Sequence, residues 1–120
     1  MMLTIPGTLP NLNDYIGACR RNKFAGAKMK NQAEHTVSIY IRAQLRHKIK
    51  NPVILHYTWY EPNKRRDLDN IAFAQKFIQD ALVNCNILQD DGWQYVQGFT
   101  HEFKVDRKNP RIEVIINEVE

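Results

Sequence analysis

The 120-residue sequence predicts an α+β fold, in which about four strands form a small mixed sheet packed with two helices in the order β-α-β-α-β-β. Two observations support this prediction. Apolar residues recur at helical spacing in two segments, and three further segments are rich in β-branched and aromatic residues. Turn residues separate these segments. The length favours one domain spanning residues 1–120, and no repeat, low-complexity segment or linker divides it.

The composition is that of a folded, basic protein. Hydrophobic residues make up 43% of the sequence and charged residues 25%, which is close to globular averages and argues against disorder. The net charge of +4 and the pI near 9.2 favour an acidic partner such as nucleic acid.

The cysteines and the N-terminal residues bear on zinc binding and on location. Cys19 and Cys85 form no Cys-x-x-Cys pair and have no histidine near them in sequence, which argues against zinc and fits a reducing compartment. Residues 1–10 reach proline before any apolar run of signal-peptide length, and no apolar run approaches the ~20 residues of a membrane span. We therefore expect a cytoplasmic protein with no membrane contact.

The N-terminal half is expected to contain one strand and one helix. Residues 3–5 alternate and end at Pro6-Gly7, which indicates a short strand, and residues 10–14 have the composition of a loop. A helix is predicted from about Met29 to about Arg46, and Asn51-Pro52 stops it. Its apolar positions are Met29, Ala33, Val37, Tyr40, Ile41 and Leu45.

The C-terminal half is expected to contain a strand, a helix and two further strands. Residues 53–60 read as a strand whose core face carries Val53, Leu55, Tyr57 and Trp59. Asp69 or Asn70 is expected to cap the next helix. Its apolar positions are Ile71, Ala74, Phe77, Ile78, Ala81 and Leu82. Residues 96–105 and 111–119 are predicted to be strands joined by a hairpin turn at 106–110.

A basic stretch runs from Tyr15 to Ala33 without any acidic residue. Cations interleaved with aromatic residues are typical of a nucleic-acid surface, and the alternative is a solvated basic loop. The cations are Arg20, Arg21, Lys23, Lys28 and Lys30.

The segment Lys64-Arg65-Arg66-Asp67-Leu68-Asp69-Asn70 combines cations with two carboxylates. In an extended segment, Asp67 and Asp69 would point the same way and reach one hard divalent ion such as Mg²⁺. Asp91 is the candidate for a third ligand. Such a cluster beside cations indicates metal-assisted phosphodiester hydrolysis. The alternative is a helix-capping turn in which Arg65 and Arg66 form salt bridges with these aspartates.

The same residues resemble a known family, the RusA-type Holliday junction resolvases. The resemblance rests on the stretch from Arg65 to Asn70, on Asp80-Ala81-Leu82, and on Asp90-Asp91 followed by Val96. Ile5-Pro6-Gly7 and Pro10-Asn11-Leu12-Asn13 also look like the start of the family, so the resemblance covers nearly the whole sequence.

The resemblance implies a homodimeric, Mg²⁺-dependent endodeoxyribonuclease, with Mn²⁺ as an alternative ion and no small-molecule cofactor. Such enzymes, often carried by phages and prophages, nick two opposing strands of a four-way DNA junction symmetrically, in recombination and repair. The essential metal-binding aspartates would be Asp67, Asp69 and Asp91. The family lysine commonly lies four residues after the second aspartate, where this sequence has Phe73. Counting back from Asp80, Lys76 is the equivalent catalytic lysine, with Lys64 as a substitute.

Three functions remain open on the sequence: a junction resolvase, a nuclease on flaps or other branched DNA, and a catalytically silent branched-DNA-binding module. The intact aspartates favour an enzyme. The residues expected to contact DNA are Asn13, Arg20, Arg21, Lys23, Lys28, Lys30, Lys64, Arg65 and Arg66.

Overall fold

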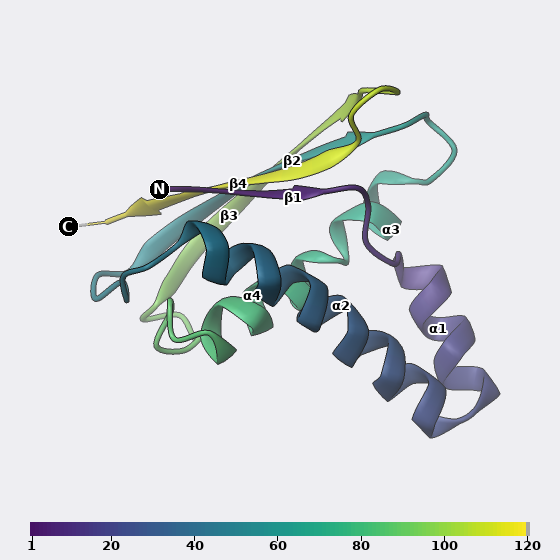
Figure 1. Ribbon diagram of the computed structural model, residues 1–120, viewed down its shortest axis with the longest axis horizontal. Helices are drawn as coiled ribbons and strands as arrows, with labels where there is room; N and C mark the ends of the chain where they lie inside the picture. Colours follow the sequence, from purple (N-terminus) through teal and green to yellow (C-terminus); the bar gives the residue numbers. More distant parts are fainter. Residues whose placement is uncertain (120) are drawn as a thin grey trace.

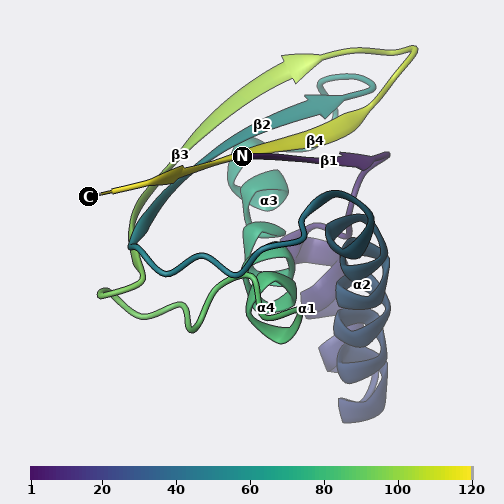
Figure 2. The same ribbon diagram turned by 60° about the vertical axis from the view of Figure 1, so that its left-hand side comes forward.

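The computed structural model describes residues 1–119 and shows one four-stranded sheet with the helices on one side of it (Figures 1 and 2). This arrangement confirms the predicted α+β class and the four-stranded mixed sheet. The predicted order β-α-β-α-β-β is wrong, because within residues 1–119 two consecutive helices lie where each single helix was expected. The elements are β1 (Met2–Pro6), α1 (Leu12–Arg21), α2 (Lys23–Gln44), β2 (Val53–Glu61), α3 (Leu68–Ala72), α4 (Gln75–Asn84), β3 (Val96–Val105) and β4 (Arg111–Glu118).

The strand order is β1-β4-β2-β3, which places β2 inside the sheet and β3 at its edge. Strand β4 is antiparallel to both β1 and β2, whereas β3 runs parallel to β2. Strand β2 alternates between buried and half-buried residues along its whole length, as expected for a strand with one face on the core. The predicted core face is confirmed, because Val53, Leu55, Tyr57 and Trp59 are all buried.

The predicted hairpin between residues 96–105 and 111–119 is wrong. Strand β2 lies between β3 and β4, so residues 106–110 carry the chain from one side of β2 to the other. The turn itself is well formed, since the Asp106 carboxylate accepts bonds from the backbone of Lys108 and Asn109 and pairs with Arg111 at 2.9 Å. Turn chemistry therefore predicted the reversal of direction but not the strand that separates its two arms.

The loop expected over residues 10–14 is instead the start of a helix. Asn11 and Asp14 form a capping box, in which each side chain accepts a hydrogen bond from the other residue's backbone N–H, at 2.8 and 3.1 Å. Asn22 then ends α1 and caps α2, which begins at Lys23, six residues before the predicted Met29. Asn11 and Asp14, interpreted as turn formers, act as a helix cap because their short side chains serve both purposes.

Helices α1 and α2 form an antiparallel pair, and Figure 1 shows them extending away from the sheet. Gly26 allows their close approach, because a Cβ atom at this position would lie 2.5 Å from the Cys19 Sγ. The sheet-proximal part of α2 packs on β1 and α4, and its predicted apolar positions are buried or half-buried. None of the helices in residues 1–119 is long and apolar enough to cross a membrane.

The helix predicted after Asp69 is divided into α3 and α4 by a turn at Phe73 and Ala74. Its apolar set is nevertheless buried as predicted, because the apolar spacing continues across the turn. The rings of Phe73 and Phe77 pack edge to face with their centroids 5.5 Å apart, and Tyr15 of α1 packs against both of them. This aromatic contact joins α1 to the segment that follows Asp69.

Candidate active site

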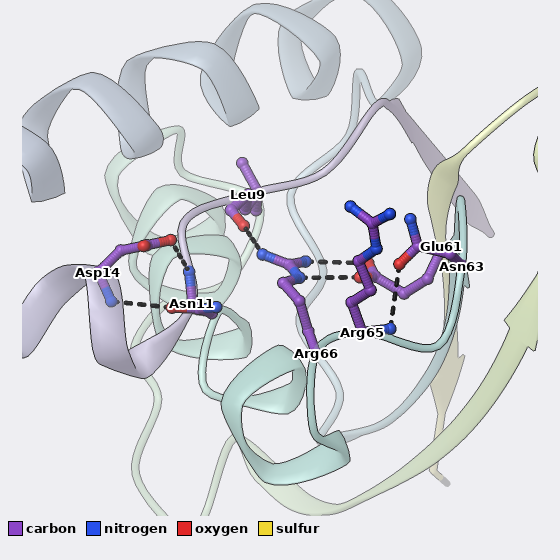
Figure 3. A network of polar contacts seen from close by, with 7 residues as sticks. All are labelled: Leu9, Asn11, Asp14, Glu61, Asn63, Arg65 and Arg66. Atoms are coloured by element: carbon purple, nitrogen blue, oxygen red, sulfur yellow. Dashed lines mark hydrogen bonds and ion pairs between the residues drawn. The ribbon is translucent and has the colours of Figure 1, made fainter.

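A partly buried ion pair anchors the segment that precedes Asp67 (Figure 3). The Arg66 Nε and Nη2 donate to the two carboxylate oxygens of Glu61 at 2.8 and 2.9 Å, and its Nη1 donates to the Leu9 carbonyl at 2.9 Å. Glu61 ends β2 and is only 6% exposed. The Arg66 side chain thus fastens the 62–67 loop both to the end of β2 and to the chain entering α1.

This ion pair bears on the alternative interpretation of the motif, a capping turn in which Arg65 and Arg66 pair with Asp67 and Asp69. That alternative is wrong for Arg66, because its guanidinium binds Glu61 instead. Arg65 is exposed, and only its backbone N–H is engaged, donating to the Asn63 Oδ1 at 3.0 Å. Among residues 1–119, neither arginine therefore neutralises Asp67 or Asp69.

Asp67 and Asp69 flank the start of α3. Asp67 occupies the N-cap position with extended backbone (φ −72°, ψ 152°), so the expectation that Asp69 or Asn70 caps the helix is wrong. The Asp67 side chain makes no capping hydrogen bond. Asp69 lies in the first turn, where its Oδ1 accepts the Asn70 N–H at 2.9 Å, so the segment is not extended throughout as supposed. Both residues are exposed, and each keeps carboxylate oxygens that no described residue occupies.

Asp91 lies in a separate group of charges. Its Oδ2 is 3.7 Å from the Lys76 Nζ, which is also 3.2 Å from the Asp80 Oδ1. The hydrogen bond to Asp80, together with the charge of Asp91, raises the pKa of Lys76 despite partial desolvation. Lys76 is therefore an ammonium ion held between two carboxylates.

The expected cluster of Asp67, Asp69 and Asp91 is not assembled within residues 1–119, which contain no group of three or more metal-ligating side chains. Asp67 lines a groove of about 660 Å³ between the 61–71 segment and the end of β3, whereas Asp91 lines a depression of about 390 Å³ between α2 and α4. Mg²⁺ keeps several waters and is usually held by one or two carboxylates, so the exposed oxygen donors of Asp67 and Asp69 are of the chemical kind that it prefers.

The predicted DNA-contacting residues lie on two surfaces. Asn13 and the cations Arg20, Arg21, Lys23 and Lys28 are exposed on the α1–α2 pair, so the alternative of a basic loop is wrong and the stretch is helical. Lys30 differs from these, since its Nζ lies 3.5 Å from the Asp80 Oδ2. Lys64 and Arg65 are exposed in the loop before Asp67.

A family model described as endodeoxyribonuclease RusA matches residues 6–117. The chain belongs to the RusA endodeoxyribonuclease family. The family assignment confirms the resemblance seen in the sequence, and it makes the protein an endonuclease of a family that resolves Holliday junctions. No curated protein matched the chain.

Within this RusA-family chain, sequence analysis missed the role of Glu61 and the exposure of Trp93. Glu61 carried a usable signal, because it continues the odd-numbered core face of β2 and a charge on that face requires a buried partner. Trp93 lies two residues after Asp91 and is 96% exposed. No local pattern distinguishes such a tryptophan from a core residue, because its exposure depends on what packs around the 89–95 loop.

Proposed function

We propose that this protein resolves four-way DNA junctions by paired, symmetric nicks, using Mg²⁺ or alternatively Mn²⁺. The observation that supports this most is the exposed Asp67–Asp69 pair, whose free carboxylate oxygens lie beside exposed cations on a segment anchored by the Arg66–Glu61 ion pair. A bound divalent ion would polarise the phosphodiester and make its water more nucleophilic. Family membership supports the substrate class.

The side chains have distinct proposed roles. Asp67 and Asp69 hold the ion, and Asp91 supplies the third carboxylate. Lys76 places an ammonium beside Asp91, where it offsets negative charge near the reacting phosphate. Lys64 and Arg65 bind the phosphates next to the Asp67–Asp69 pair, and the exposed cations of the α1–α2 pair bind phosphates farther along the strand.

Aspartate-to-asparagine variants test the metal-binding roles. Asp67→Asn, Asp69→Asn and Asp91→Asn are each expected to abolish cleavage while junction binding survives, because a lost ligand disables the chemistry without removing a phosphate contact. Glu102→Gln removes one charge from an exposed position on β3 and serves as the control. Full activity of any one aspartate variant with an intact fold would remove that residue from the site.

Two symmetric nicks require two active sites, which a closed homodimer supplies. We expect sedimentation to show a dimer, and an active monomer would contradict this. Since Asp91 lies apart from the pair in one chain, mixing Asp67→Asn with Asp91→Asn subunits reveals whose Asp91 completes each site. A mixed dimer contains one intact site only if Asp91 acts across subunits. Restored nicking therefore indicates sharing between chains, and continued inactivity indicates that each chain completes its own site.

Substrate choice is tested with four-way, flap and duplex DNA of matched sequence, with and without Mg²⁺. Selective, Mg²⁺-dependent nicking of the four-way junction supports the proposal. Flap cleavage at equal or higher rate identifies a broader branched-DNA nuclease, and binding without any cleavage identifies a silent binding module.

Trp93 is proposed to stack on a base exposed at the branch point. An aromatic side chain that is 96% exposed offers a face that any base can cover. Because Trp59 is buried, Trp93 should account for most fluorescence change when DNA binds. Quenching by junction DNA is expected in the native protein and should be lost in Trp93→Phe. Equal quenching in both proteins would contradict the contact.

A further inference from the structure

A continuous set of ion pairs joins α2, α4 and the loop that follows α4. The two carboxylate oxygens of Asp80 contact different lysines: Oδ2 lies 3.5 Å from the Lys30 Nζ, and Oδ1 lies 3.2 Å from the Lys76 Nζ. Lys76 in turn contacts Asp91 at 3.7 Å. Lys76 therefore lies between two carboxylates, of which only Asp91 has a proposed part in the chemistry.

We infer that Asp80 is a positioning residue, which holds the Lys76 ammonium away from full pairing with Asp91 and so keeps the Asp91 carboxylate accessible to a cation. This inference rests on the proposed nuclease function. It assigns to Asp80 no contact with DNA or with the reacting atoms.

Asp80 is well placed to act in this way because its own position is constrained. It lies on α4 among Phe77, Ile78, Ala81 and Leu82, whose buried side chains fix the helix against the core. The Asp80 side chain is 17% exposed, whereas that of Lys76 is 57% exposed. An isolated exposed pair four residues apart on a helix would restrain a lysine only weakly. Here the carboxylate is shielded, and Lys30 of α2 holds it from the other side.

The consequence for Asp91 follows from the charges that line the depression of about 390 Å³. Glu34 and Asp90 also line it, but neither forms an ion pair with Lys76 among residues 1–119. If Asp80 lost its charge, Asp91 would be the one remaining described carboxylate paired with Lys76. The ammonium would then bind Asp91 more closely and compete with any cation for the same oxygens.

The experiment compares Asp80→Asn with Glu34→Gln, which removes a charge from the same depression without breaking a contact to Lys76. Single-turnover cleavage of a four-way junction is measured at saturating enzyme over a range of Mg²⁺ concentrations, and junction affinity is measured without metal. We expect Asp80→Asn to raise the Mg²⁺ midpoint about tenfold, as for other residues that orient a metal ligand, with junction affinity little changed. Glu34→Gln should leave both quantities unchanged.

Lys30→Met provides a second variant whose expected effect has the opposite sign. Without Lys30, the Asp80 carboxylate pairs with Lys76 alone. The stronger attraction should draw the Lys76 ammonium away from Asp91 and lower the Mg²⁺ midpoint. Lys30 is itself a proposed DNA contact, so saturating enzyme is needed to separate this effect from weaker binding.

Double-mutant cycles between Lys76→Met and Asp80→Asn separate positioning from a general effect on the fold. If Asp80 acts through Lys76, the effects of Asp80→Asn and Lys76→Met on thermal unfolding should be non-additive, and this readout is independent of the proposed catalytic part of Lys76. A native Mg²⁺ midpoint in Asp80→Asn, or additive effects on thermal unfolding, would overturn the inference. If the native protein cleaves no branched DNA, the proposed function fails, whereas the unfolding cycle still tests the contact between Asp80 and Lys76.

Discussion

Removal of the Arg66 guanidinium is expected to destabilise the protein strongly, although Arg66 lies in a loop. In Arg66→Ala, Glu61 would remain at the end of β2 with its carboxylate buried and without its bidentate partner. Breaking a buried ion pair from one side costs about 3–5 kcal/mol, and the 24% exposure of the Arg66 side chain favours the lower end, about 3 kcal/mol. For a domain of this length, that loss corresponds to a decrease in Tm of about 12 °C.

Thermal unfolding followed by circular dichroism measures this effect, with Arg65→Ala as the matched control. Arg65 is the adjacent arginine and has an exposed side chain, so its removal should cost about 0.5 kcal/mol or less. The double variant Glu61→Leu/Arg66→Met replaces the pair by apolar side chains and should recover most of the lost stability. If Arg66→Ala and Arg65→Ala melted within about 2 °C of each other, the buried pair would not restrain the loop as described.

Three further predictions concern DNA affinity, pH and helix packing. Replacing Arg20 and Arg21 by alanine should flatten the slope of the logarithm of the DNA-binding constant against the logarithm of the salt concentration by roughly 0.9 per lost phosphate contact. An unchanged slope with altered dimerisation would instead place these residues at a subunit interface. Burial lowers the pKa of His101 below its ordinary value of 6.5, so the unfolded chain takes up the proton first as the pH falls. The free energy of unfolding should therefore decrease as the pH drops through 6.5 and should level off below the lowered pKa. The melting temperature of His101→Gln should lack this part of the pH dependence. An identical pH dependence in the native protein and the variant would contradict the prediction. Gly17→Ala meets no atom within 4 Å and should raise stability by about 0.5–1 kcal/mol, whereas Gly26→Ala is expected to melt below it because of the Cys19 contact. Equal melting temperatures would show that α1 and α2 do not approach closely at Gly26.

Local patterns in the sequence were sufficient to predict the strands, their buried faces and the apolar faces of the helices. The alternation of residues 53–61 and the spacing of the apolar residues in α2 and α4 are properties of neighbouring residues, so they appear in the structure as predicted. The order of residues around Asp67, Asp69 and Asp91 also sufficed to recognise the family. Helix caps were harder to predict, because asparagine and aspartate favour turns and caps by the same hydrogen bonds.

The tertiary structure alone decided which distant groups meet. Strand β2 pairs with both β3 and β4, so the predicted hairpin between β3 and β4 does not form. The alternating patterns of two strands do not indicate that a third strand lies between them. Arg66 binds Glu61 and the Leu9 carbonyl rather than the adjacent aspartates. Lys76 lies between Asp80 and Asp91. These partners are set by how the sheet edge, α1 and α4 pack together. A charged side chain binds the opposite charge that packing brings near and shields from water, and sequence spacing specifies neither of these conditions.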